Sequence, residues 1–157
     1  MIVETLALLS PAYFSSPFAT LSCLLPRRHP VDFNIRLRDG NRLLGDGKTW
    51  EGLLLGTLLG GVAGALVYIP FGISENPFLM AFLGLLGDMM GSFAKRRMGL
   101  ERGEHAPLLD ELDFLAPPLM YALPPAADVA VILVVTPFLH RLASAAGYAA
   151  GVKREPW

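Results

Sequence analysis

Three aspartates close to basic residues are the side chains in this sequence best suited to chemistry. Asp88 lies in an apolar stretch, and Asp110 and Asp113 follow in the next polar segment, one helical turn apart. Ionisable side chains at membrane depth are costly, so Asp88 is a functional candidate. Carboxylate oxygens hold Mg²⁺, usually together with substrate phosphates. The three aspartates therefore predict a magnesium site that handles phosphate groups.

Other polar side chains share the predicted helix of Asp88. The positions of Asp88, Ser92 and Lys95 correspond to i, i+4 and i+7, which puts a carboxylate, a hydroxyl and an ammonium on one helix face. A salt bridge alone could account for Asp88 and Lys95. Helix capping could account for Asp110 or Asp113 taken singly. The whole set is harder to explain by structure alone and favours a catalytic site.

A second polar segment, residues 26–50, contains Gly-Asp-Gly-Lys-Thr at 45–49. A lysine and a hydroxyl at the start of a helix can present an ammonium, a hydroxyl and backbone N–H groups to phosphate. This is not a Walker A loop, because Arg42 stands where that motif needs its first glycine. The segment is therefore a candidate phosphate-binding loop or, alternatively, a basic loop that touches anionic lipid headgroups.

The composition indicates a membrane protein. Of the 157 residues, 53% are hydrophobic and 17% are charged, whereas a soluble domain has roughly 25% charged residues. The net charge of −1 does not support nucleic-acid binding, which usually needs a strongly basic domain. The sequence contains no hydrolase, dinucleotide-binding or His/Cys metal-binding motif. Membrane lipids are therefore expected partners, and nucleic acids are not.

Apolar segments long enough to approach the ~20 residues of a membrane-spanning helix predict an all-α integral membrane protein. The fourth segment contains Pro117 and Pro118 and is expected to be broken or kinked. Residues 1–157 are expected to form a single transmembrane catalytic domain in the cell membrane. The five expected spans are about 2–25, 52–71, 77–93, 112–123 and 128–142.

The basic residues predict the orientation of these spans. All 13 lysines and arginines fall in residues 26–51, in residues 94–111 or in the segment from Arg141 to the end of the chain. Five spans put all of them on one side, whereas four would distribute them over both. The positive-inside rule then predicts an outside N-terminus, an inside C-terminus and two cytoplasmic loops, 26–51 and 94–111.

Glycines recur every four residues from Gly52 to Gly64, and again at Gly87 and Gly91. Small residues at this spacing let helix backbones approach closely in a membrane. We expect these faces to pack helices within one chain or between two chains of a homodimer, with no part in chemistry.

The segment from Gly87 to Leu100, followed by Pro107 to Asp113, resembles the signature of membrane CTP:phosphatidate cytidylyltransferases. Their pattern is a Gly-Asp, a Ser and a Lys-Arg, then a Pro and a Leu-Asp-Arg-x-Asp. The sequence is even more similar to the short archaeal CDP-archaeol synthases, which share Gly-Asp-Gly-Lys-Thr-Trp at 45–50. It departs from the bacterial-type pattern at Glu111, which stands in place of the arginine.

The resemblance implies an Mg²⁺-dependent nucleotidyltransferase. Such an enzyme moves CMP from CTP to a prenyl-ether glycerol phosphate, unsaturated archaetidic acid, and yields CDP-archaeol and pyrophosphate at the cytoplasmic face. By the resemblance, the metal-binding and catalytic residues are Asp88, Asp110 and Asp113, Lys95 joins them in catalysis, and Ser92 and Arg96 contact substrate. The loop residues expected to help form the nucleotide site are Asn34, Asp46, Gly47, Lys48 and Thr49.

Two other functions are weaker alternatives. One is a small multi-pass transporter or channel with Asp88 in the ion path. The outer halves of the spans carry no ionisable residues except Glu4 and Asp128 near their ends, which argues against a polar route. The other is a CDP-alcohol phosphotransferase, whose motif separates its paired aspartates by four residues, whereas Asp110 and Asp113 are three apart.

Overall fold

A computed structural model describes residues 1–101 and 104–149. The basic residues Arg102, Lys153 and Arg154, and with them the predicted inside C-terminus, lie outside these ranges. The described chain is helical. Its elements are α1 (Ile2–Thr20), η1 (Leu21–Leu24), α2 (Trp50–Phe71), α3 (Pro77–Arg97), α4 (Leu109–Leu112), η2 (Asp113–Leu115), α5 (Ala116–Ala122) and α6 (Ala126–Ala149).

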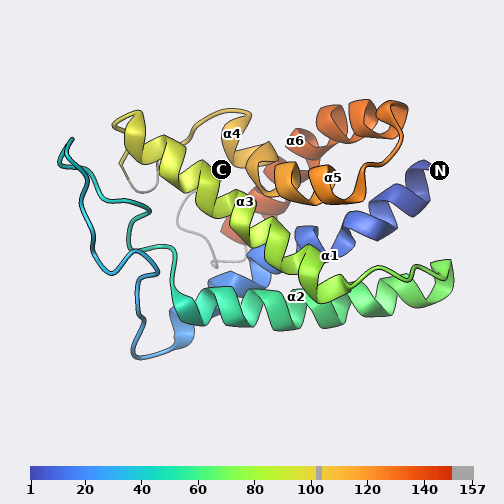
Figure 1. Ribbon diagram of the computed structural model, residues 1–157, viewed down its shortest axis with the longest axis horizontal. Coiled ribbons are helices and arrows are strands. Elements are labelled where there is room, and N and C mark those ends of the chain that lie inside the picture. The colour runs from blue at the N-terminus through green and yellow to red at the C-terminus, as the bar shows by residue number, and fades with distance from the viewer. Residues whose placement is uncertain (102–103, 150–157) are drawn as a thin grey trace.

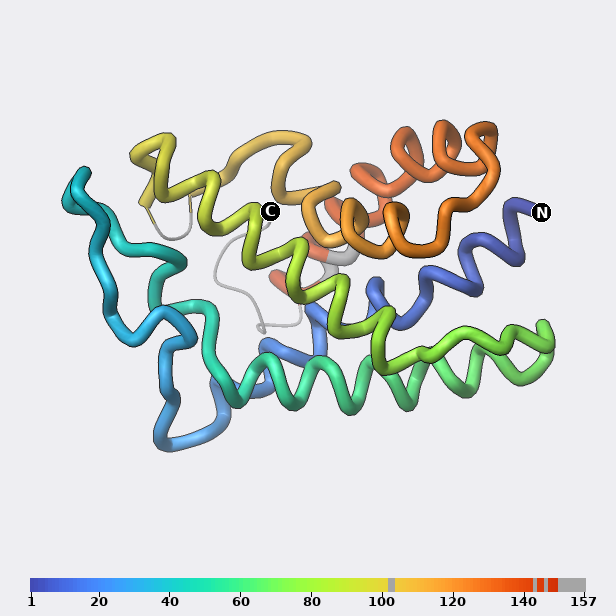
Figure 2. The backbone as a smooth tube through the Cα atoms, in the orientation of Figure 1, coloured from blue at the N-terminus to red at the C-terminus, as the bar shows by residue number. Residues whose placement is uncertain are grey.

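The helices form a bundle with its long polar loop at one end (Figure 1). α1, α2 and α3 pack against one another, and α4, η2 and α5 lie against α3. The N-terminus and the connections at 72–76 and 123–125 lie at one end, while the 26–49 loop and the C-terminal end of α3 lie at the other (Figure 2). This grouping of loops matches the one predicted from the distribution of charge.

Three described helices, α2, α3 and α6, are long and apolar enough to cross a membrane. α2 and α3 agree with the predicted spans 52–71 and 77–93, and α6 is longer than the predicted 128–142. The predicted break in 112–123 is confirmed, because the chain there forms parts of α4, η2 and α5. The seven residues of α5 rise only about 10 Å, so the structure does not confirm five spans.

The ends of the two long central helices follow from local sequence. Thr49 is the N-cap of α2, and its hydroxyl accepts a hydrogen bond from the N–H of Gly52. α2 ends at Gly72, which has a left-handed φ of 63°. Asn76 caps α3, and Pro77 occupies its first turn. These caps fix where α3 begins and therefore the direction in which its polar C-terminal end points.

The glycine faces pack helices within the chain. A Cβ at Gly56 would lie 2.6 Å from the carbonyl oxygen of Ser15, and a Cβ at Gly64 would lie 2.2 Å from Cγ of Pro11. α1 therefore covers this face of α2 at close range. Of the two expected arrangements, the structure shows packing within one chain, and the homodimer stays a prediction.

Polar pairs attach α6 to α1. The Thr5 hydroxyl donates to Asp128 at 2.6 Å, and Tyr13 and Thr136 share a hydrogen bond of 2.6 Å. In an apolar environment such pairs satisfy groups that lipid cannot. Asp128, which the sequence placed near the end of a span, therefore has a partner in the bundle.

Candidate active site

The 26–49 loop is folded by two short antiparallel pairings. In the first, the N–H of Val31 donates to the carbonyl of Lys48 at 2.9 Å, so Lys48 returns to the base of the loop. In the second, the N–H of Leu37 donates to the carbonyl of Asn41 at 3.0 Å, which forms a hairpin. Gly40 in its turn has a φ of 80°, a conformation that favours glycine.

Asp32 and Arg42 form the core of this loop. Asp32 is 2% exposed and accepts from Nε and Nη2 of Arg42 at 3.1 and 2.6 Å. Burial alone would raise the pKa of Asp32, but the guanidinium and three backbone N–H groups outweigh burial and hold this pKa well below its usual range. The backbone donors are Asn34, Leu44 and Gly45.

Arg97 joins the hairpin to the end of α3. Its Nη1 lies 2.5 Å from Oδ2 of Asp39, and its Nη2 lies 2.5 Å from the carbonyl oxygen of Arg42. The hairpin is therefore attached beside the last turn of α3. The role of Arg97 could not be predicted from the sequence, because its partners depend on how the loop folds.

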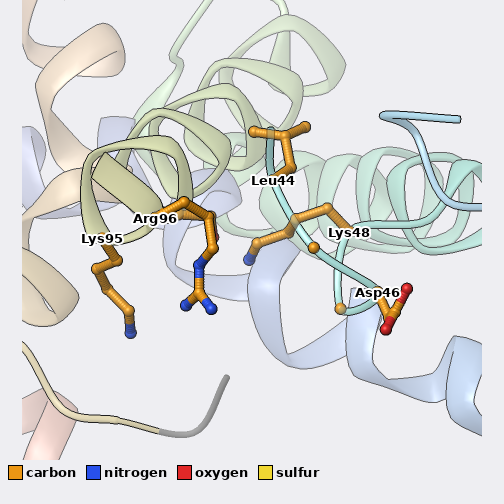
Figure 3. Close-up of a pocket in the computed structure, with 8 residues that line it drawn as sticks. Leu44, Asp46, Lys48, Lys95 and Arg96 are labelled. Atoms are coloured by element: carbon orange, nitrogen blue, oxygen red, sulfur yellow. The ribbon is translucent and has the colours of Figure 1, made fainter. Parts of the chain in front are cut away.

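This attachment creates a small polar cavity between the loop and α3. The cavity has a volume of about 160 Å³. Figure 3 shows Lys48 extending from the loop toward α3. The Asp46 carboxylate points away from Lys48, Lys95 and Arg96. The residues that line the cavity are Leu44, Gly45, Asp46, Gly47, Lys48, Ser92, Lys95 and Arg96.

The cations at the cavity differ in their partners. Nζ of Lys48 lies 2.5 Å from Oδ2 of Asp88, and Nζ of Lys95 lies 2.9 Å from Oδ1 of Asp110. Arg96 has no ion pair within the described residues, and its buried Nε has no hydrogen-bond partner there. The cavity thus presents an uncompensated guanidinium, which suits an anionic ligand such as phosphate.

The three predicted aspartates come to the same side of α3 from separate elements. Asp88 is on α3, Asp110 on α4 and Asp113 on η2. Asp113 lies within electrostatic range of both other aspartates and of Lys48. Ser16 on α1 also reaches this group, because its hydroxyl donates to Asp88 at 3.4 Å. The structure therefore brings Lys48 to Asp88 and Lys95 to Asp110 from separate elements, with Asp113 near Asp88.

Comparison with known proteins shows the family. The family model for CarS-like CDP-archaeol synthase matches residues 1–157. The chain belongs to the CDP-archaeol synthase family. It is therefore an enzyme, a cytidylyltransferase, and neither the transporter nor the CDP-alcohol phosphotransferase alternative is supported.

Individual relatives match over nearly their whole length. The CDP-archaeol synthase of Pyrobaculum arsenaticum is 41% identical, with 96% of each chain covered. That of Aeropyrum pernix is 40% identical, with 99% of this chain and 92% of the relative covered. A solved structure of an intramembrane enzyme for archaeal membrane lipid biosynthesis is 39% identical and has a TM-score of 0.81, covering 91% of this chain and 94% of that one. This chain is therefore a membrane protein with the same fold.

The carboxylates of this CDP-archaeol synthase family member suit an Mg²⁺ ion that is bound jointly by protein and substrate. Within the described residues, no three His, Cys, Asp or Glu side chains converge closely enough to hold a metal ion by themselves. Mg²⁺ rarely uses such a cage, however, and is commonly bound by one or two carboxylates with water and substrate phosphates. The hard oxygen donors beside a cationic cavity suit that arrangement.

Two of the predicted substrate-binding residues, Thr49 and Asn34, do not line the cavity. Thr49 is 4% exposed, and its hydroxyl caps α2 and contacts Ser22 at 3.5 Å. A threonine directly before an apolar helical run is a typical N-cap, a signal that the sequence contained. Asn34 lies in a turn with a φ of 64°, outside the cavity lining.

Glu111 is a buried residue to which the sequence assigned no role. It is 0% exposed and accepts from Nε of Arg141 at 3.1 Å and from the N–H of Leu108. His105 lies 3.4 Å away. Glu111 thus ties the segment that carries Asp110 to α6. In the sequence, Glu111 was notable only because it replaces the arginine of the bacterial-type pattern. This replacement did not predict Arg141 or Leu108 as hydrogen-bond partners.

Proposed function

We propose that this protein transfers the cytidylyl group of CTP to a prenyl-ether glycerol phosphate, unsaturated archaetidic acid, and yields CDP-archaeol and pyrophosphate. The observation that carries this proposal is the cation-lined cavity directly beside Asp88, in a chain of this family. The relatives named above are CDP-archaeol synthases. The lipid substrate is assigned by that relationship.

The cations of the cavity bind the triphosphate. One cation, Lys48, comes from the 26–49 loop, and two, Lys95 and Arg96, come from α3. Together they can contact several phosphate oxygens of one nucleotide. The Ser92 hydroxyl adds a hydrogen-bond donor on the same wall. Charge that develops on the phosphate oxygens in the transition state is stabilised by these preorganised cations. Arg96 is already without a partner within the described chain and needs to break no ion pair to bind.

The acceptor reacts without a general base. An oxygen of the lipid phosphate is ionised at neutral pH and attacks the α-phosphorus of CTP. A new P–O bond forms to the lipid phosphate, and the bond from the α-phosphorus to the bridging oxygen breaks. Pyrophosphate leaves with that electron pair, so no proton transfer is required of the protein. The residues of the site therefore act by orientation and charge neutralisation.

Mg²⁺ completes the site in this proposal. Asp88, Asp110 and Asp113 are the residues that would hold it together with the nucleotide. When bound, the ion would supply Lewis-acid stabilisation of charge on the phosphates. The lysines now paired with Asp88 and Asp110 are then free to contact phosphate oxygens instead.

We place the site at the cytoplasmic face of the cell membrane. The site lies at the bundle end that holds the 26–49 loop (Figure 1), and this loop contains six of the 13 lysines and arginines. The positive-inside rule assigns that end to the cytoplasm. CTP is a soluble metabolite of that compartment. The apolar surfaces of the multi-pass bundle accommodate the lipid chains beside the site.

Purified protein tests the proposal directly. We expect labelled CTP, Mg²⁺ and a prenyl-ether glycerol phosphate to yield a CDP-lipid. Asp88→Asn is expected to lower this rate at least a hundredfold while the protein still inserts in membranes. Glu4→Gln is a matched control, since Glu4 is an exposed carboxylate at the opposite end of the bundle. An Asp88→Asn enzyme as active as the control would contradict the role of Asp88.

A further inference from the structure

We propose that Gly91 is a positioning residue that seats the carboxylate of Asp113 against α3, one helical turn from Asp88. Its role rests on the proposed function, because the position of Asp113 matters to turnover only if this carboxylate takes part in cytidylyl transfer. The glycine spacing by itself indicates only helix packing. The contact between Gly91 and an ionisable side chain is what distinguishes this glycine.

The space occupied by Asp113 is the space that a side chain on residue 91 would need. A Cβ on Gly91 would lie 1.8 Å from Oδ2 of Asp113, 2.6 Å from its Cγ and 2.8 Å from its Cβ. All three separations are below 3.0 Å, a distance that real Cβ contacts essentially never reach. Rotation of the carboxylate cannot relieve the overlap, because Cβ of Asp113 does not move in such a rotation.

Gly87 provides the other half of this seat. A Cβ on Gly87 would lie 2.2 Å from the carbonyl oxygen of Asp113 and 2.9 Å from Cα of Phe114. The backbone of η2 therefore rests on Gly87, and the Asp113 side chain rests on Gly91 one turn later. Asp88 follows Gly87 directly. The two glycines thus set how deeply Asp113 approaches the helix that carries Asp88.

The other close-packed glycines of the bundle contact a different kind of neighbour. A Cβ on Gly84 would meet Cα and Cβ of Ala12 on α1, both at 2.9 Å. A Cβ on Gly60 would lie 2.8 Å from Cα of Ser15, also on α1. These contacts hold α1 against its neighbours and involve no predicted catalytic group. Gly84 is therefore a matched control for Gly91 on the same helix.

Steady-state kinetics of two alanine variants separate positioning from packing. Gly91→Ala is expected to lower kcat at least tenfold with a smaller change in KM for CTP, because Asp113 is not among the residues that line the cavity. Gly84→Ala is expected to lower Tm but to keep kcat per folded enzyme within twofold. If both variants lose kcat equally for equal losses of Tm, the positioning role of Gly91 is overturned.

Thermal stability gives a second readout that needs no activity. Gly91→Ala is expected to lower Tm in the native chain but much less in an Asp113→Gly background, which removes every side-chain atom that would overlap. Equal losses of Tm in both backgrounds would overturn the contact. Absence of cytidylyl transfer by the unsubstituted chain would overturn the proposed function, and the catalytic role of Asp113 with it. Transfer unaffected by Gly91→Ala would overturn the role of Gly91 alone.

Discussion

The ammonium nitrogen of Lys48 lies 2.5 Å from a carboxylate oxygen of Asp88. This contact joins the 26–49 loop to α3 at the centre of the site. Both side chains are 23% exposed, so each is a half-buried charge that relies on the other. In the proposed reaction, the nucleotide phosphates replace Asp88 as the partner of Lys48. Binding of substrate therefore changes the charge balance of the site at this ion pair.

Loss of the Lys48 charge should weaken CTP binding. We expect Lys48→Met to raise KM for CTP at least tenfold and to lower kcat, because a phosphate contact is lost and Asp88 is left unpaired. Lys48→Arg is expected to recover part of the activity. Arg27→Gln, an exposed cation of the same loop away from the cavity, is the control. Equal KM values for Lys48→Met and Arg27→Gln would contradict the assignment.

Arg96 and Arg97 should separate into binding and structural roles. Arg96→Gln is expected to raise KM for CTP at least tenfold with Tm unchanged, since Arg96 has no partner to lose within the described residues. Arg97→Gln is expected to expose the hairpin to protease, because it loses its contacts with Asp39 and Arg42. Limited proteolysis and kinetics on both variants check this. The opposite pattern would show that the two roles are exchanged.

The ion pair of Asp32 should make loop stability depend on pH. Its pKa is lower in the folded loop than in the unfolded chain, so its contribution is complete above the ordinary carboxyl value of about 4 and is lost as pH falls below that. The amides of Leu44 and Gly45, which donate to Asp32, report this by hydrogen exchange. We expect Asp32→Asn to reduce their protection at least tenfold at pH 7.

A control variant uses the same arginine. Asp46 pairs with Arg42 at 2.8 Å, but its side chain is 62% exposed. Exposed ion pairs contribute little, so Asp46→Asn should leave the protection of these amides nearly unchanged. Protection lost equally in both variants would mean that Asp32 is not the core of the loop.

Thr49 should act as a helix cap. Thr49→Ala is expected to cost about 1 kcal/mol of stability, because the N–H of Gly52 loses its acceptor. Thr49→Ser should retain the cap. In both variants KM for CTP is expected to stay within twofold of the unsubstituted enzyme. A tenfold rise in KM for Thr49→Ala without loss of Tm would instead support the substrate-binding role predicted from the sequence.

The sequence could predict those site residues whose charge is energetically unfavourable in their surroundings. A charge inside an apolar helix is unfavourable, which singled out Asp88, and helical spacing then linked it to Ser92 and Lys95. The partners of Asp32 and Arg97 could not be predicted, since many loop arginines and aspartates are equivalent until the chain folds. Glycine spacing predicted close packing but did not show that Gly91 faces a carboxylate.

The helices show the same division. Hydropathy located α2 and α3 because long apolar runs with caps have few alternative structures. Residues 112–123 read as a span by composition, yet they fold as short pieces against α3. Pro117 and Pro118 predicted the break. The packing of this segment against Gly87 could not be predicted, because it depends on tertiary contacts.

Transfer of label from CTP tests the central claim most directly. Purified protein is incubated with Mg²⁺, a prenyl-ether glycerol phosphate and CTP labelled at either the α- or the γ-phosphate. We predict that the α-label appears in the lipid product, that the γ-label appears in pyrophosphate, and that the two form in equal amounts. Release of γ-label as inorganic phosphate with no α-label in lipid, or no release of either label by folded protein, would contradict the account.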